Sequence, residues 1–383
     1  MSLPWTLVCS RCGAVRDAEG LPGVCPIDGA PYLVKYPALP AAGAKSLLED
    51  RRWSMWRYRE WLPLADGEQP VSLGEGGTPL LTLDHLGPER GFEALLVKDE
   101  GLNPTGSFKA RGLAAAVSRA VLAGATKLVV PTAGNAGVAL AAYAARAGVT
   151  ARVYAPASTP ATIRSQIEHF GADLQLIDGH IGDCGKAARG FAAETGAVDV
   201  STLREPYRIE GKKTLGLELA EQLGWTLPDV IVYPTGGGTG LIGMWKAFGE
   251  LREAGWVRGG LPRMFTVQAT GCAPVVQAFE TGADHCTPWP DPQTVAAGLR
   301  VPGPLGDRLM LKALRESGGG AVSVTDEILT RAADDLQRRE GIDAAPEGGA
   351  ALAAAVELLR RGAIRASDRV VLFNTGAGWL YRS

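Results

Sequence analysis

The chain has 383 residues, of which 46% are hydrophobic and 21% are charged, and its formal net charge is −2. At roughly 150 residues per domain, this length is enough for two domains that each bury a core. The balance of 39 basic and 41 acidic residues gives no electrostatic reason to expect a nucleic acid or an anionic membrane as partner. No apolar run reaches the roughly 18 residues of a membrane-spanning helix.

The first residues, MSLPWTLVCSRCG, lack the basic start and the long apolar stretch of a secretion signal. Six cysteines are scattered along the chain, and three of them fall within the first 25 residues. This spacing favours a reduced, cytoplasmic protein over a disulfide framework.

Residues 1–35 have the outline of a zinc ribbon. The possible ligands are Cys9, Cys12, Cys25 and Asp28, because two thiolates in a C-x-x-C turn can share one tetrahedral ion. The second pair reads CPID, with an aspartate where a second ribbon cysteine would stand. Two interpretations stay open: a zinc-binding segment, or a metal-free remnant of a ribbon that packs on the main body.

The connector Arg51–Leu64, RRWSMWRYREWLPL, predicts a short helix with anchoring aromatic residues at Trp53, Trp56 and Tyr58. Basic residues interleaved with aromatic ones can bind single-stranded nucleic acid. In a chain of net negative charge we interpret this short helix as a packing surface.

From Leu95 onward, short apolar runs alternate with helical patterns, as in KLVVPTA followed by NAGVALAAYAARAG. This alternation predicts an α/β protein with two open, mostly parallel α/β domains whose sheets are covered on both faces. The expected partition is a larger domain of residues 36–94 with 210–383 and a smaller domain of residues 95–209. Ligands of such sheets bind beyond the carboxyl ends of the strands, so we expect the site in the cleft between the domains.

Three loops at predicted strand ends, together with Lys109, carry the chemistry. PTAGNAG opens a helix whose free N–H groups suit a carboxylate, and its Asn135 can donate to a phenolic oxygen. PTGGGTG lets the backbone approach a phosphate closely, and it matches neither a Walker nor a dinucleotide motif. FNTGAG offers Thr375 as a hydroxyl partner.

These features provide an amine for an aldehyde, a cup for a phosphate, a hydroxyl for a ring nitrogen and an amide for a ring hydroxyl. Pyridoxal 5′-phosphate carries the matching groups. A lysine condenses with an aldehyde only when its amine is neutral, and burial next to a positive helix end lowers its pKa. The sequence therefore predicts that Lys109 binds this cofactor covalently.

At this point the chain resembles the threonine synthases, which are fold-type II pyridoxal-phosphate enzymes. The resemblance runs from about residue 74 to 378 and is carried by SLGEGGTPL, NPTGSFKARG, TAGNAGVALAAYAARAG, YRIEGKKT and VIVYPTGGGTGLIG. It implies the two-domain fold of these enzymes, with the cofactor between the domains, and a homodimer. It also implies a small-molecule substrate, O-phospho-L-homoserine, which reacts with water to give L-threonine and phosphate.

The resemblance also implies roles for individual residues. Lys109 is the Schiff-base lysine and removes and returns protons, Asn135 binds the 3′-hydroxyl, and Thr375 meets the ring nitrogen. The cofactor phosphate is held by the loop residues Gly236, Gly237, Gly238, Thr239 and Gly240. The substrate carboxylate faces Thr132, Ala133 and Gly134. For the leaving phosphate, the candidates are Thr105, Ser107, Arg164 and Thr78.

Two positions depart from the family pattern near the site. Residue 110 is alanine where many relatives have aspartate, and the tail reads TGAGWLY where TGHGLK is common. These departures bear on substrate identity, so a threonine or serine dehydratase on the same scaffold stays open. A nicotinamide-dependent oxidoreductase is disfavoured because Glu253, about 20 positions after the glycine loop, falls within a helix and not at a strand end. A relative that only binds ligands is the remaining alternative.

Overall fold

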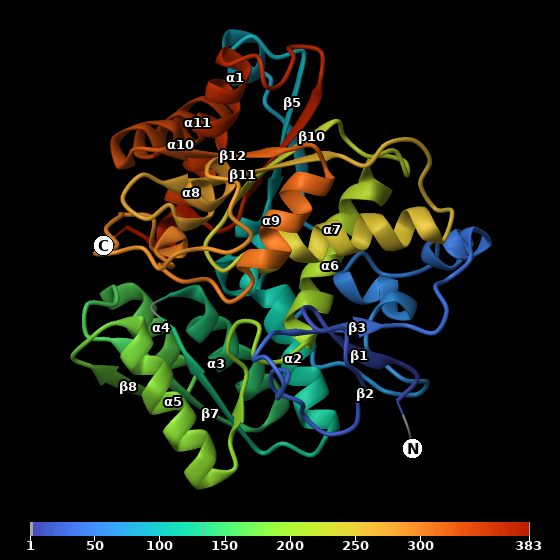
Figure 1. Ribbon diagram of the computed structural model, residues 1–383, viewed down its shortest axis with the longest axis vertical. Helices are drawn as coiled ribbons and strands as arrows, with labels where there is room; N and C mark the ends of the chain where they lie inside the picture. The colour runs from blue at the N-terminus through green and yellow to red at the C-terminus, as the bar shows by residue number, and fades with distance from the viewer. Residues whose placement is uncertain (1–2, 133, 383) are drawn as a thin grey trace.

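The computed structural model describes residues 3–132 and 134–382, whose strands form three sheets (Figure 1). A six-stranded sheet has the order β12 (Gly320–Val324), β11 (Arg263–Ala269), β10 (Val230–Pro234), β13 (Arg369–Asn374), β5 (Ala94–Asp99) and β4 (Leu80–Thr82). A four-stranded sheet has the order β8 (Asp173–Ile177), β7 (Thr150–Pro156), β6 (Lys127–Pro131) and β9 (Val198–Asp199). The third sheet, near the N-terminus, has the order β2 (Val15–Asp17), β1 (Thr6–Cys9) and β3 (Tyr32–Lys35).

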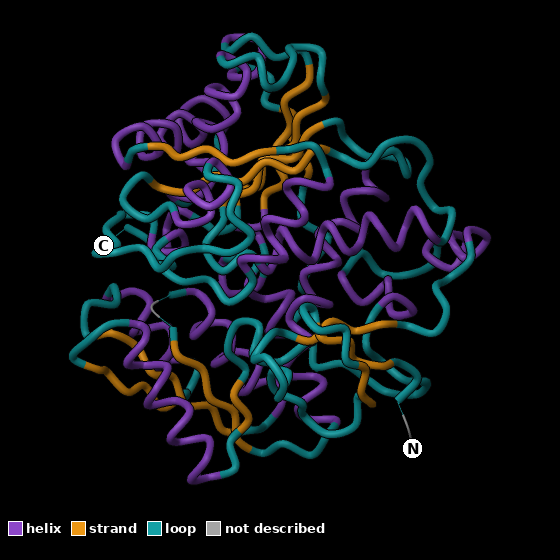
Figure 2. Tube along the Cα trace, in the orientation of Figure 1, coloured by secondary structure: helices purple, strands orange, loops and turns teal. Residues whose placement is uncertain are grey.

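Helices connect and cover these strands, as the alternation of purple and orange in Figure 2 shows. The α-helices are α1 (Leu86–Glu89), α2 (Lys109–Leu122), α3 (Asn135–Ala147), α4 (Ala161–His169), α5 (Ile181–Thr195), α6 (Tyr207–Gln222), α7 (Thr239–Glu253), α8 (Pro274–Glu280), α9 (Asp307–Glu316), α10 (Asp326–Glu340) and α11 (Pro346–Arg360). The 3₁₀ helices are η1 (Ala42–Leu48), η2 (Met55–Trp61), η3 (Glu100–Leu102), η4 (Pro104–Gly106), η5 (Ala297–Leu299) and η6 (Gly378–Leu380). No helix among the described residues is long and apolar enough to cross a membrane.

The six-stranded sheet is parallel except for β4, which pairs antiparallel at the edge. Its central strand β10 is apolar throughout because both of its faces are buried. Val230 and Val232 pack in one core with α10 and α11, whereas Ile231 and Tyr233 pack in another with α6 and α7. This alternation of side chains places helices on both faces, as the sequence predicted.

The four-stranded sheet is parallel and is also covered on both faces. Leu128 and Val130 of β6 pack with α2, α3 and α4, while Val129 packs with Ala188 of α5 on the opposite face. The prediction of mostly parallel sheets is therefore confirmed for both α/β units.

One strand lies outside the unit to which the sequence assigned it. The expected boundary at residue 95 placed β5 in the smaller domain, but β5 pairs with β13 along its whole length and with β4 on its other side. Its apolar residues Leu95 and Val97 complete the core of the six-stranded sheet, which is why it belongs there. The remaining domain boundaries stay predictions.

The N-terminal sheet is antiparallel and has a small core of its own. That core includes Tyr207, the first residue of α6, whose hydroxyl donates to the carbonyl of Ala18 at 3.3 Å. In Figure 1 this sheet lies beside α6 and α2. The connector that follows contains η2, in which Tyr58 is fully buried, so it serves as a packing surface there.

Candidate active site

Lys109 is the first residue of α2, at the end of the loop that follows β5. In this loop Thr105 has a φ of +63° and Gly106 a φ of +71°, a pair of left-handed residues that turns the chain sharply. The N–H of Phe108 then donates to the carbonyl of Thr375 at 3.0 Å. The loop that carries Lys109 is therefore fastened to the carboxyl end of β13.

Burial lowers the pKa of the Lys109 amine to about 8, and the nearby Arg208 lowers it further while Glu347 opposes the shift. A lysine in this state has a substantial neutral fraction near neutral pH, as addition to an aldehyde requires. The position predicted for a covalent lysine thus has the electrostatics that such a lysine needs.

The glycine loop lies between β10 and α7, and three of its glycines are required by close neighbours. A Cβ on Gly236 would collide with the carbonyl of Gly298, and one on Gly240 would collide with the Tyr233 hydroxyl. Gly238 has a φ of +76°, and a Cβ there would meet Met310. Only glycines allow this course of the backbone.

The same loop has the donors that a phosphate needs. The N–H groups of Gly236, Gly237 and Gly238 donate no hydrogen bond to any residue that the structure describes, and Thr239 begins the 15-residue helix α7. Free backbone donors at a helix N-terminus bind anions, and the predicted loop residues Gly236 to Gly240 supply them. The residues present fit the phosphate of pyridoxal phosphate.

Asn135 and Thr375 approach from the two sheets. Asn135 begins α3 after β6, and its amide donates to the Tyr381 hydroxyl at 3.4 Å. It also lies beside Gly376, where a Cβ would be 3.4 Å from the amide nitrogen. Thr375 follows β13 and is 7% exposed, and its hydroxyl has no hydrogen bond within the described chain. The two expected ring contacts therefore lie close together at the junction of the two α/β units.

The predicted substrate-carboxylate residues lie at the start of α3. The Thr132 hydroxyl accepts a hydrogen bond from the N–H of Gly134 at 3.1 Å, which closes a tight turn before the helix. Ala133 lies outside the described residues. The role of this turn in binding a carboxylate stays a prediction.

The four candidates for the leaving phosphate have different surroundings. The hydroxyls of Thr105 and Ser107 are buried and have no partner among the described residues, although they flank the loop of Lys109. Arg164 lies on α4, and its buried Nε also has no partner there. Thr78 is different, because its hydroxyl donates to Glu100 at 2.6 Å and accepts from Arg111 at 3.1 Å. It belongs to a buried ion-pair network.

Comparison with known proteins identifies the family. A family model described as "Pyridoxal-phosphate dependent enzyme" matches residues 71–376, which include all the loops described above. The chain belongs to this family.

Curated relatives within this family share the full set of elements. The chain is 34% identical over 372 residues to a threonine synthase of Methanocaldococcus jannaschii, covering 97% of this chain and 91% of the relative. It is 38% identical over 324 residues to a threonine synthase of Methanosarcina acetivorans, covering 84% of this chain and 79% of the relative. A threonine synthase of Mycobacterium tuberculosis is 35% identical and is covered to 86%.

Solved structures of the same fold include a bacterial threonine deaminase. It is 28% identical with a TM-score of 0.66, and the match covers 78% of this chain and 92% of that one. A maize serine racemase is 23% identical with a TM-score of 0.70, covering 79% and 88%. These similarities establish the fold-type II architecture for the two α/β units.

Within this pyridoxal-phosphate enzyme, the structure places two further cations near Lys109 that sequence reasoning did not assign. Arg208 and Lys212 lie on α6, are 2% and 0% exposed, and have no carboxylate within 4.0 Å among the described residues. Arg208 donates only to the Val200 carbonyl at 2.9 Å, and Lys212 only to the carbonyl of Phe108. The motif YRIEGKKT contained both residues, but its sequence alone does not reveal which of its cations lack a partner.

Glu347 and Tyr381 were also missed. Glu347 is in the first turn of α11 and 3% exposed, and it receives hydrogen bonds from the N–H of Gly298 at 2.7 Å and from the Tyr381 hydroxyl at 3.1 Å. Burial raises the pKa of its carboxyl, an effect that these donors and Lys109 partly offset. The departure of the tail from the family pattern was the available signal, because that tail carries Tyr381.

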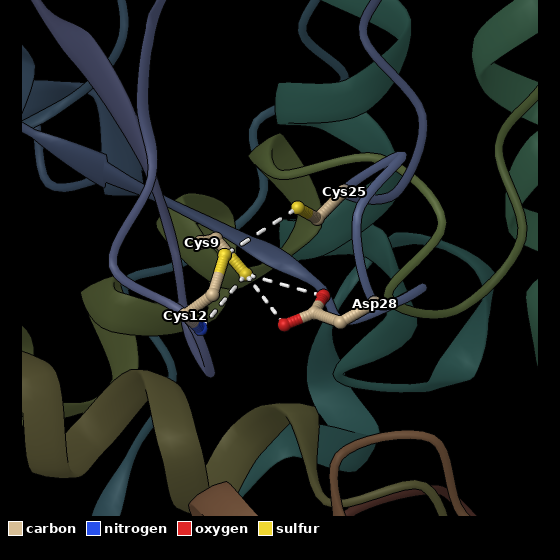
Figure 3. A group of neighbouring side chains, drawn as sticks. All are labelled: Cys9, Cys12, Cys25 and Asp28. Atoms are coloured by element: carbon tan, nitrogen blue, oxygen red, sulfur yellow. Dashed lines mark hydrogen bonds between the residues drawn. The ribbon is translucent and has the colours of Figure 1, made fainter.

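The four expected metal ligands of the N-terminal segment lie together (Figure 3). One ligand atom from each of Cys9, Cys12, Cys25 and Asp28 lies within 4.8 Å of all the others. The Cys9 thiol is 3.4 Å from an Asp28 oxygen, and the thiols of Cys12 and Cys25 are 3.8 Å apart. Ligands about 2.3 Å from a tetrahedral zinc ion are spaced by roughly 3.8 Å, so the residues present fit such an ion.

Proposed function

We propose that this protein is a threonine synthase, which converts O-phospho-L-homoserine and water into L-threonine and phosphate. The observation that carries the proposal is that buried cations without a carboxylate partner in the described chain, Arg208 and Lys212, accompany the separate glycine loop. A buried charge without a partner is costly, so such cations favour a ligand that brings an anion. A reaction in which cofactor and substrate each carry a phosphate needs two anion sites.

The relatives support the same reaction. Threonine synthases from three organisms are 34–38% identical to this chain over most of its length. The threonine deaminase and the racemase share the fold at lower identity. Sequence similarity therefore favours the synthase reaction over the dehydratase reaction.

The proposed cofactor site uses the residues predicted from the sequence. Lys109 binds the aldehyde, Asn135 the ring hydroxyl and Thr375 the ring nitrogen, while the loop from Gly236 to Gly240 holds the phosphate. When bound, pyridoxal phosphate withdraws electrons from the substrate carbon that bears the amine.

The protein's own groups then handle protons and phosphate. Lys109, once released by the substrate amine, takes the proton from Cα and returns protons later, since its pKa near 8 suits both directions. Thr105 and Ser107 offer unpaired hydroxyls to the substrate phosphate, and Arg208 offers its guanidinium. Thr78 is a weaker candidate, because its hydroxyl is engaged by Glu100 and Arg111.

The test is product formation by the cofactor-loaded enzyme from O-phospho-L-homoserine, with phosphate and threonine measured together. We expect equal amounts of both, and Lys109→Ala should reduce the rate by about 10³-fold or more. Lys186→Ala is the matched control, because the Lys186 side chain is 76% exposed on α5. Undiminished turnover by Lys109→Ala would refute the role of this lysine.

A second function, threonine or serine dehydratase, is supported by the similarity to the threonine deaminase structure. It would use the same lysine and would need no second phosphate site. Release of ammonia and a keto acid from threonine or serine, without phosphate from O-phospho-L-homoserine, would establish this alternative.

We also propose that the N-terminal segment is a zinc ribbon with Cys9, Cys12, Cys25 and Asp28 as ligands. The spacing of the four ligand atoms supports this, and so do the N–H groups of Arg11 and Cys12, which point at the Cys9 sulfur at 3.4 and 3.5 Å. Such N–H···S bonds help to hold a thiolate in place.

Metal analysis of the purified protein tests the ribbon. We expect about one zinc ion per chain, and Cys12→Ser should lower this content strongly. Cys184→Ser is the control, because Cys184 is buried far along the chain in α5. Zinc content equal in both variants would contradict the proposed ligand set, and a cytoplasmic location and a homodimer remain predictions to be tested alongside.

A further inference from the structure

Glu347 is the carboxyl group whose charge acts on Lys109, and one of its oxygens is free. Its Oε1 is held by the N–H of Gly298 at 2.7 Å and by the Tyr381 hydroxyl at 3.1 Å. Its Oε2 is buried and has no hydrogen-bond partner in the described part of the chain. Leaving a buried carboxylate oxygen without a donor costs about 1–3 kcal/mol or more, so a structural role alone does not account for it.

The surroundings are built to hold this carboxyl in place. Gly298 must be glycine, because a Cβ there would lie 2.7 Å from Glu347 Oε1. Tyr381 connects Glu347 to the Asn135 amide, which donates to the tyrosine hydroxyl at 3.4 Å. The free oxygen of Glu347 is thus presented beside the residues proposed to bind the cofactor.

The charges that face Lys109 come from two helices. On α6, the guanidinium of Arg208 disfavours a proton on Lys109, and the Lys212 amine lies on the same side, with its own pKa well below the ordinary value because of burial. On α11, the carboxyl of Glu347 favours that proton, and Tyr381 is its hydrogen-bond donor. Glu347 is therefore the counterweight to the cations of α6.

We propose that Glu347 is a positioning residue, held by Tyr381 and Gly298, whose free carboxylate oxygen sets how strongly the Lys109–cofactor link holds its proton. This rests on the part of the proposed function that joins the cofactor to Lys109, and it does not depend on which substrate the enzyme uses. The role matters chemically because the protonated link is the form that a substrate amine attacks readily.

The test is a spectrophotometric pH titration of the cofactor-loaded enzyme, since the visible absorbance of the Lys109-bound cofactor reports the proton on the link. Glu347→Gln should lower the midpoint by about one pH unit, because it removes a negative charge with little change in shape. Tyr381→Phe should lower it by less, because the carboxylate loses one donor but remains. Glu347→Asp should restore most of the wild-type midpoint.

Arg208→Gln provides the opposite sign. It removes a positive charge from the other side of Lys109, so the midpoint should rise. A merely structural role for Glu347 predicts no such pair of opposite shifts. The inference is overturned if Glu347→Gln binds the cofactor fully and keeps the wild-type midpoint, or if the midpoint rises.

If Glu347→Gln fails to fold, Tyr381→Phe decides, and an unchanged or raised midpoint in that variant overturns the inference. Failure of the proposed reaction is a separate result. Wild-type enzyme that titrates as expected but releases no phosphate from O-phospho-L-homoserine would refute the synthase and leave the role of Glu347 standing.

Discussion

The protein buries basic side chains in two neighbouring regions that differ in what faces them. In the first, Lys98 lies 2.5 Å from Glu218, and Arg111 lies 2.7 Å from Glu100 and 3.0 Å from Glu218, with every side chain fully buried. In the second, Lys109, Arg208 and Lys212 have no carboxylate within 4.0 Å in the described chain, although Arg208 and Lys212 are also buried.

The difference separates architecture from chemistry. Paired buried charges satisfy one another, and they fasten β5, α2 and α6 together whether or not a ligand is present. Unpaired buried cations are stabilised only when an anion arrives. Residues of one helix, α6, take part in both regions, because Glu218 faces the network while Arg208 and Lys212 face the site.

The largest effect should come from breaking the paired region. Arg111→Met leaves Glu100 and Glu218 without their shared partner, and we expect the free energy of unfolding to fall by about 3–5 kcal/mol. Urea denaturation of the protein measures this. A loss below about 1 kcal/mol would contradict the assignment of Arg111 to the architecture of the fold.

The same substitution in the unpaired region should behave differently. Arg208→Met removes no ion pair, so we expect little loss of stability, whereas kcat/KM for O-phospho-L-homoserine should fall by about 10- to 100-fold through loss of a charged hydrogen bond. Steady-state kinetics together with urea denaturation separate the two effects. Destabilisation as large as that of Arg111→Met, with unchanged kinetics, would erase the contrast between the regions.

A pH dependence sharpens the comparison further. Lys109 has a pKa of about 8, below its ordinary value of 10.5, so the cofactor-free protein should take up pyridoxal phosphate faster as pH rises toward 8 and level off above it. Below pH 8 the rate should change by about tenfold per pH unit, and stopped-flow absorbance measures it. Because the folded pKa is lowered, the unfolded chain binds more protons between pH 8 and 10.5, so burial of Lys109 destabilises the fold fully below pH 8 and this cost disappears as pH rises to 10.5. Lys109→Met should abolish the pH-dependent uptake.

The smallest effect should come from an exposed pair. Arg331 lies 2.8 Å from Glu327 on α10, and the two side chains are 71% and 79% exposed. Arg331→Met should change the free energy of unfolding by less than about 0.5 kcal/mol, because water screens such pairs. It is the matched control for Arg111→Met, and a comparable loss in both would show that burial does not decide the outcome.

The sequence predicted the strands and helices of both α/β units because their apolar runs and amphipathic patterns are local signals. It also placed Lys109 at a helix start and the glycine loop before α7, since turn residues and glycines mark such positions. Strand β5 was assigned to the wrong unit because pairing with β13, about 270 residues away along the chain, leaves no local pattern.

The residues that sequence reasoning missed have the same origin. Glu347 becomes notable only because the tail brings Tyr381 to it and leaves one oxygen free. Thr78 was a candidate ligand because of its hydroxyl, and only the tertiary contacts with Glu100 and Arg111 show that the hydroxyl is already engaged.

The N-terminal sheet is joined to the chemistry by a single peptide bond. Tyr207 completes the core of that sheet, and the guanidinium of Arg119 stacks over both Trp5 and Tyr207, 5.1 Å and 5.9 Å from their ring centres. The next residue is Arg208. A small appendage that could be mistaken for a removable decoration therefore forms the outer wall behind a reactive centre, and trimming it from the gene would unseat the guanidinium on the inner side of that wall.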